Sequence, residues 1–217
     1  MTNDKGKKKV QYIQIPNALI RDPNLTSLDF LILIKLKQLQ FINGSYEFCF
    51  NSKEHIKLPL NINDNRTVKK SLDNLYKHKY ILQPVKIDSH SFGKVMLNSL
   101  LINAKNNYTH VYTSVMKKLP LLGYNGFRLL FYYESYINRK AIGKASNQFC
   151  YTSIDTISKE TGLTNKTIIK YNELLKKERF LDIDKHELGT DYRYDENDKV
   201  IFNRYNNHYF VRLENIL

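Results

Sequence analysis

The chain has 217 residues, with 34 Lys and Arg against 21 Asp and Glu, and a formal net charge of +13. This basic balance favours a polyanionic partner, because Lys and Arg release counterions from phosphates, although a membrane surface satisfies the same charge. The sequence contains no run of about 18 apolar residues and no charged-then-apolar leader. It therefore predicts no transmembrane helix, no secretory signal and no membrane partner, and we expect a cytoplasmic protein.

The two cysteines, Cys49 and Cys150, lie in matched Phe-Cys-Phe and Phe-Cys-Tyr contexts. Two thiols are too few for a metal cluster, and free cysteine is among the most buried residue types. We expect both thiols to be buried in short strands rather than to form a disulfide or a redox pair.

The first eleven residues are polar and rich in lysine. A segment of this composition has too little apolar surface to pack, so the sequence predicts a disordered basic arm over residues 1–11. Such an arm can thread a DNA groove, as homeodomain arms do, or remain a free tail.

One pattern of elements then occurs twice at an interval of about one hundred residues. Phe48 corresponds to Phe149, and Ile81 corresponds to Leu181. This repeat predicts two domains, one over residues 12–103 and one over residues 108–217.

Each copy is expected to contain a buried helix, a short strand, a pair of helices joined by a turn, and two further strands. In the first copy the first helix is expected at 27–41, the strands at 46–50, 81–87 and 94–102, and the turn between the paired helices at Asn61. In the second copy the helix is expected at 126–137, the strands at 148–151, 181–186 and 205–213, and a polar wing at 187–203.

The second helix pair has the clearer sequence signature. Thr152 is expected to cap its first helix, and Gly162 to supply the left-handed turn after it. Thr164 is then expected to cap the second helix, which buries Ile168, Tyr171 and Leu175. The side chains expected to point outward are Asn165, Lys166, Thr167 and Lys170.

Three helices with a small antiparallel sheet make a winged helix, so the expected fold class is α+β, mainly helical, with two tandem winged-helix domains. In this order of elements the chain resembles the tandem winged-helix replication initiators of plasmids and phages. The resemblance implies that one domain mainly dimerises while the other reads repeated origin sites in double-stranded DNA. It also implies host replication proteins and a second copy of the chain as partners.

The candidate DNA contacts follow from the outward side chains, because amides, hydroxyls and cations are the groups that a major groove and its phosphates bind. Base reading is assigned to Asn165, Lys166, Thr167 and Lys170, and phosphate contact to Lys176 and Lys177. Their counterparts in the first copy are Asn65, Arg66, Lys69 and Lys70. The wing candidates are Tyr192 and Arg193 in the second copy, and His90 and Lys94 in the first.

The sequence does not predict an enzyme, a cofactor or a metal site. The six histidines include no pair separated by one or three residues, which argues against a nicking site and a zinc helix. Two alternatives to a replication initiator remain: a winged-helix transcription regulator, and a protein-binding adapter. The adapter surface would be the aromatic helix at 127–136, although a buried first helix accounts for those aromatic residues equally well.

Overall fold

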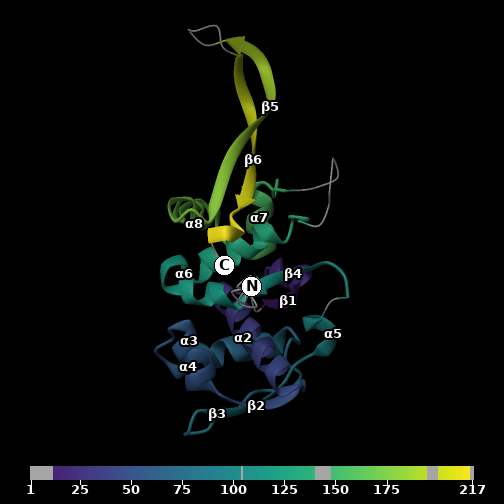
Figure 1. Ribbon diagram of the computed structural model, residues 1–217, viewed down its shortest axis with the longest axis vertical. Helices are drawn as coiled ribbons and strands as arrows, with labels where there is room; N and C mark the ends of the chain where they lie inside the picture. The colour runs from purple at the N-terminus through teal and green to yellow at the C-terminus, as the bar shows by residue number, and fades with distance from the viewer. Residues whose placement is uncertain (1–11, 104, 140–147, 195–199, 216–217) are drawn as a thin grey trace, which may run out of the picture.

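The computed structural model describes residues 12–103, 105–139, 148–194 and 200–215, and it shows a mainly helical α+β chain (Figure 1). The helices are α1 (Asn17–Ile20), α2 (Ser27–Asn43), α3 (Leu58–Leu60), α4 (Asn65–Lys77), α5 (Ser99–Ile102), α6 (Leu119–Glu134), α7 (Ile154–Thr161) and α8 (Asn165–Lys177). A π-helical turn, η1 (Lys53–Lys57), precedes α3, and 3-10 turns lie at Thr113–Lys118 and Leu213–Asn215. The arm predicted at 1–11 lies outside the described residues.

The described strands form three separate two-stranded antiparallel sheets. They are β1 (Tyr12–Pro16) with β4 (Tyr108–Tyr112), β2 (Glu47–Asn51) with β3 (Phe92–Met96), and β5 (Leu181–Tyr194) with β6 (Val200–Val211). None of the helices in the described part of the chain has the length and apolar character needed to cross a membrane.

Helix α2 is the central helix of the N-terminal half, as predicted. Thr26 and Asp29 form a capping box at its start, in which each side chain accepts a hydrogen bond from the other residue's backbone N–H. Gly44 ends the helix in the left-handed conformation, at φ +67°. Because Phe30 and its neighbours through Ile34 are all buried, α2 is a core element rather than an amphipathic surface helix.

The prediction of two strands at 81–87 and 94–102 is largely wrong. Residues 81–87 form only isolated bridges, Ile81 with Leu97 and Ile87 with Gly93, and β3 pairs instead with β2. Pro84 has no N–H to donate to a ladder, so a continuous strand cannot form there. Asn98 then caps α5 by accepting a hydrogen bond from Leu100 N, which turns the end of the predicted strand into a helix.

Helix α6 is the counterpart of α2 in the C-terminal half. It begins at Leu119, before the predicted start, and its helical geometry is interrupted at Gly123, at φ 64° and ψ 172°. Phe131, Tyr132 and Tyr133 are fully buried. These aromatic residues therefore belong to the core, and α6 does not offer the exposed aromatic surface that an adapter would use.

Strands β1 and β4 join the two halves of the chain, and this pairing was not expected. Ile13 lies opposite Val111 and Ile15 opposite Thr109, all four of them buried. The start of the first predicted domain thus forms a sheet with the start of the second.

A buried arginine on α6 strengthens this junction. The Arg128 guanidinium donates to the backbone carbonyls of Asp22 at 2.6 Å, Ile20 at 3.4 Å and Leu25, which lie at the end of α1 and in the segment that connects it to α2. Burial lowers the pKa of Arg128 to about 10, so the side chain keeps its charge at neutral pH. One buried cation thus donates to three backbone carbonyls, of which that of Asp22 also accepts from Leu25 N at 3.2 Å, and this makes the contact costly to remove.

Two further contacts connect the halves. Arg21 donates to Ser135 O at 2.7 Å, and its guanidinium lies 3.6 Å from the centre of the Tyr136 ring. Nearer the start of α6, the Tyr124 hydroxyl donates to Leu60 O at 2.8 Å. The two halves are therefore held together at several points.

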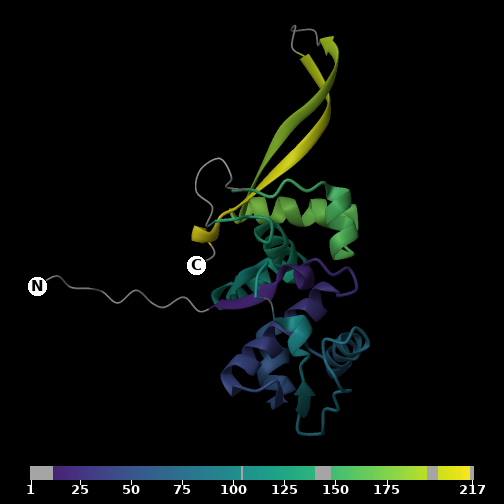
Figure 2. The same ribbon diagram turned by 90° about the vertical axis from the view of Figure 1, so that its right-hand side faces the viewer.

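The hairpin of β5 and β6 projects away from the helices at the end of the molecule opposite β2 and β3 (Figure 1 and Figure 2). The strands run further than predicted, to Tyr194 and from Val200, and so occupy most of the segment expected to be a polar wing. Alternating Thr190, Tyr192 and Tyr194 favour a strand there.

The strand predicted at 148–151 is reduced to one bridge, between Cys150 and Tyr209. Cys150 is buried, as expected, but Cys49 is exposed, because the Phe side chains on either side of it face the core. Phe48 and Phe149 are therefore not equivalent, since Phe149 stacks at 4.1 Å on His208 at the partly exposed hairpin base. The inward residues that correspond are Phe50 and Cys150.

Candidate nucleic-acid interface

The second helix pair, α7 and α8, has a well-defined turn. Gly162 ends α7 at φ +69°, as predicted, and a Cβ added there would lie 2.9 Å from Pro23 O. Ser158 donates to Leu163 O at 2.6 Å across the same turn. The residue that caps α7 is Ser153, not Thr152, because the Ser153 hydroxyl accepts from Thr156 N while Thr152 is buried beside Cys150.

Helix α8 rests on α6 through its inner face. Ile168 and Leu175 are fully buried, and Asn172 accepts a hydrogen bond from the buried Tyr133 hydroxyl at 2.6 Å. The Tyr171 ring packs so closely on Gly126 that an added Cβ would lie 3.1 Å from it. These contacts fix the rotation of α8 about its axis and so determine which side chains face solvent.

The outer face of α8 is polar and basic. Its exposed residues are Asn165, Lys166, Ile169, Lys170, Glu173, Lys176 and Lys177. None of the four lysines forms an ion pair with a carboxylate of the described residues. Their charge is therefore free to act on an anionic partner.

Two of the predicted base-reading residues have partners within the helix pair. The Asn165 amide donates to Asp155 Oδ1 at 2.8 Å, which orients the amide and leaves its oxygen and its second N–H free. Thr167 is half-buried, and its hydroxyl lies 2.9 Å from that of the capping residue Thr164. Thr167 thus acts in the N-cap and does not point outward as expected.

The first helix pair, η1 with α3 followed by α4, repeats this plan. Asn61 adopts the left-handed conformation at φ 53°, as predicted for the turn. Asp64 caps α4 by accepting from Thr67 N at 2.7 Å and from the Thr67 hydroxyl at 2.8 Å, and these hydrogen bonds lower the pKa of the carboxyl. The cap is therefore ionised near neutral pH and compensates the positive end of the helix.

The exposed residues of α4 are Asn65, Arg66, Lys69, Lys70, Asp73, Tyr76 and Lys77. The Asn65 oxygen accepts from Lys57 Nζ at 2.9 Å, which leaves both amide hydrogens free. Arg66, Lys69 and Lys70 form no ion pair within the described residues. All four predicted residues of this helix thus lie together on one exposed surface.

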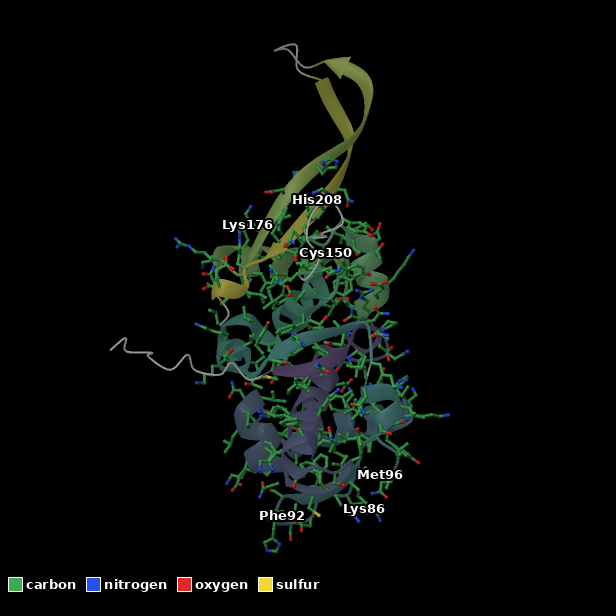
Figure 3. All side chains as sticks on the ribbon, turned by 45° about the vertical axis from the view of Figure 1, so that its right-hand side comes forward. Lys86, Phe92, Met96, Cys150, Lys176 and His208 are labelled. Carbon is green, nitrogen blue, oxygen red and sulfur yellow. The ribbon has the colours of Figure 1, made fainter. Side chains whose placement is uncertain are left out.

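The wing candidates are placed less favourably. Lys94 lies on β3 and pairs with Glu47 at 2.6 Å, which neutralises part of its charge. Figure 3 shows its strand neighbour Phe92 and nearby Lys86 at the end of the molecule away from Lys176 and His208. Tyr192 and Arg193 lie on β5, but their side chains fall outside the described set.

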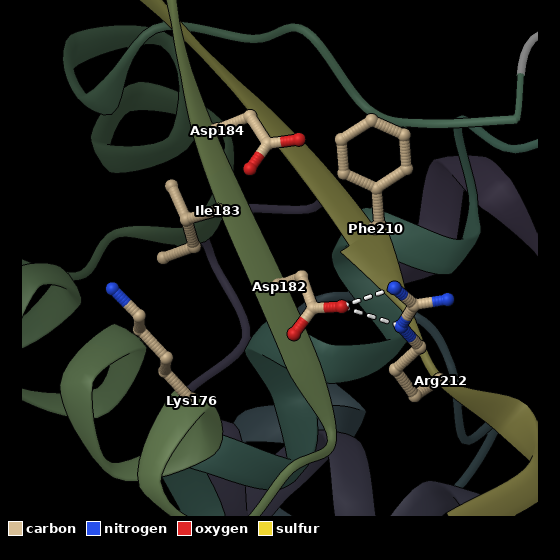
Figure 4. Close-up of a pocket in the computed structure, with 6 residues that line it drawn as sticks. All are labelled: Lys176, Asp182, Ile183, Asp184, Phe210 and Arg212. Atoms are coloured by element: carbon tan, nitrogen blue, oxygen red, sulfur yellow. Dashed lines mark hydrogen bonds and ion pairs between the residues drawn. The ribbon is translucent and has the colours of Figure 1, made fainter.

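A shallow pocket lies where α8 meets the hairpin (Figure 4). It is lined by Lys176, Asp182, Ile183, Asp184, Phe210 and Arg212. Asp182 is paired with Arg212, whereas Asp184 has no ion pair within the described residues. Lys176 therefore borders carboxylates, so Lys177 is better placed for a phosphate.

One exposed residue of this face was not identified as a candidate from the sequence. Ile169 is 50% exposed in the middle of the basic face of α8. Its position one residue before Lys170, at helical spacing from Asn165, could have identified it.

We find no match to any model of a known protein family, and no curated protein similar to this chain.

Proposed function

We propose that the protein binds double-stranded DNA sequence-specifically through two winged-helix units, with α4 and α8 as the recognition helices. The observation that carries the proposal is the outer face of α8, where Asn165, Lys166 and Lys170 surround an exposed isoleucine and no described carboxylate pairs with the lysines. Amide, cation and methyl groups are the base-edge contacts of the major groove.

The two units would share one plan. In each, a capped helix follows a left-handed turn, at Asn61 and Gly162. The proposed wings are the chain that returns to β3 after α4 in the first unit and the hairpin of β5 and β6 in the second. The formal charge of +13 supplies the sequence-independent part of the affinity, because each phosphate neutralised releases counterions.

Within this class we propose a replication initiator of the plasmid and phage type. The support is the resemblance in element order, together with the junction through Arg128, which holds the two helix pairs in one arrangement. A fixed arrangement suits a protein that must engage a long site with both units. Host replication proteins are the proposed protein partners.

Selection of bound duplexes from a random pool, followed by footprinting on DNA flanking its own gene, tests the proposal. We expect an enriched motif that recurs as repeats in the footprint. A single palindromic site with changed transcript levels on deletion would identify a transcription regulator instead. Failure to bind any duplex at low salt would contradict DNA binding altogether.

A further inference from the structure

The exposed faces of α4 and α8 occupy the same seven positions. Both helices are 13 residues long, and each cap, Asp64 or Thr164, accepts from the backbone N–H three residues on. Val68 and Ile168 are buried at the same position, as are Leu75 and Leu175. An interval of 100 residues therefore superimposes the two faces residue by residue.

The chemistry of these faces is conserved between the copies at five of the seven positions. The matched pairs are Asn65 with Asn165, Arg66 with Lys166, Lys70 with Lys170, Asp73 with Glu173, and Lys77 with Lys177. The two first-turn asparagines have different partners, yet each keeps at least one free N–H for a purine N7.

Packing does not account for this agreement. Two buried or half-buried positions have diverged strongly, Ser71 against Tyr171 and Leu72 against Asn172. Core positions constrain a helix most and solvated positions least, so a duplicated helix without a ligand should show the opposite pattern. A shared ligand on the exposed face explains why five exposed positions agree while two inner positions have diverged.

We infer that α4 and α8 read two half-sites of nearly the same base sequence, which differ at the base pair facing position 69 or 169. This inference rests on the proposed DNA binding. Lys69 is suited to the acceptors of guanine, whereas the half-exposed Ile169 is suited to the methyl group of thymine. The substrate is thus a duplex that carries two related half-sites.

Exchange of the two side chains tests the inference on the full-length chain. Selection with the wild type should yield two half-sites that share a motif and differ at one base pair. Ile169→Lys should make the two half-sites alike by changing the preferred base from thymine to guanine in the half-site read by α8. Lys69→Ile should make them alike by changing the preferred base from guanine to thymine in the half-site read by α4. We expect a change in preference of roughly tenfold or more at that base pair.

Both substitutions lie on solvated helix surface, so the variants should fold. Lys176→Tyr is the matched control: it copies Tyr76 into the last turn of α8 and should leave the base preference unchanged. Two unrelated half-sites, a single half-site, or unchanged preference in both exchange variants would overturn the inference while leaving DNA binding intact. No enrichment of any sequence would contradict the proposed function as well.

Discussion

The two helix pairs differ most in what supports their turns. In the second pair, Gly162 packs against Pro23 O, and α8 rests on the buried Tyr133 and the glycines of α6. In the first pair, the turn at Asn61 is exposed, and α4 is attached through Asn74, which donates to Asn24 O and to Asp29. The segment between α1 and α2 contacts both pairs, so similar outer faces are presented by differently built supports.

The largest expected effect comes from separating the two halves. Arg128→Met should lower the free energy of unfolding by about 3 to 5 kcal/mol, because the carbonyls of Ile20, Asp22 and Leu25 lose a charged donor inside the protein. Urea unfolding measures the change. Arg66→Met, at an exposed arginine, is the control and should cost less than about 0.5 kcal/mol. Equal losses in both variants would show that the junction does not depend on Arg128.

A smaller effect distinguishes the two turns. Gly162→Ala should cost about 2 to 3 kcal/mol, because its φ of +69° disfavours a side chain and the new Cβ would meet Pro23 O at 2.9 Å. Asn61→Gly should be neutral or slightly stabilising, since its turn is exposed and already left-handed. Thermal unfolding of both variants checks the contrast. A tolerated alanine at Gly162 would mean that the turn is not packed as described.

DNA binding should separate two lysines of α8. Lys166→Ala should cost about 1 to 3 kcal/mol on the selected site and blur its sequence preference, because a base-edge contact is lost. Lys177→Ala should weaken all duplexes alike. Titration of both variants against selected and scrambled duplexes provides the comparison. Equal loss on every sequence from Lys166→Ala would refute its base-reading role.

The smallest effect concerns acid stability at Asp22. Burial alone would raise the pKa of this carboxyl, but hydrogen bonds from Tyr80 and Asn24 outweigh it and lower the pKa. A lowered folded pKa contributes stability above the unfolded value of about 3.9, and that stability is lost as the pH falls through the folded pKa. Asp22→Asn should therefore flatten the acid limb of the unfolding free energy, by about 1 kcal/mol or less because the group is partly exposed. An unchanged acid limb would argue against this role.

Local signals predicted the parts of the fold that local energetics decide. The apolar run of α2, the left-handed turn at Gly162 and the cap at Thr164 were sufficient to place α2, the end of α7 and the start of α8, because apolar runs, caps and turns are encoded within a few residues. The exposed faces of α4 and α8 follow from helical periodicity.

Contacts between distant segments were not predictable in this way. The pairing of β1 with β4 joins short strands about one hundred residues apart, and no local pattern encodes a partner at that distance. The inward side of the strand before each helix pair was also misjudged, because Phe50 faces Gly93 whereas the smaller Cys150 faces Tyr209. A large residue faces a small one in the first copy, and a small residue faces a large one in the second. The sequence therefore does not reveal that Phe50 and Cys150 occupy equivalent positions. Thr167 was misassigned because its hydroxyl is drawn into the cap by Thr164.

The salt dependence of duplex binding tests the central claim most directly. Wild-type affinity should fall linearly on a log–log plot against salt concentration, and a variant with Lys166, Lys170, Lys176 and Lys177 changed to Gln should have a shallower slope. The slope should decrease by about 0.9 for each of these lysines that contacts a phosphate. Identical slopes for wild type and variant, or no binding of any duplex by the wild type at low salt, would contradict the assignment of α8 as a DNA-binding helix.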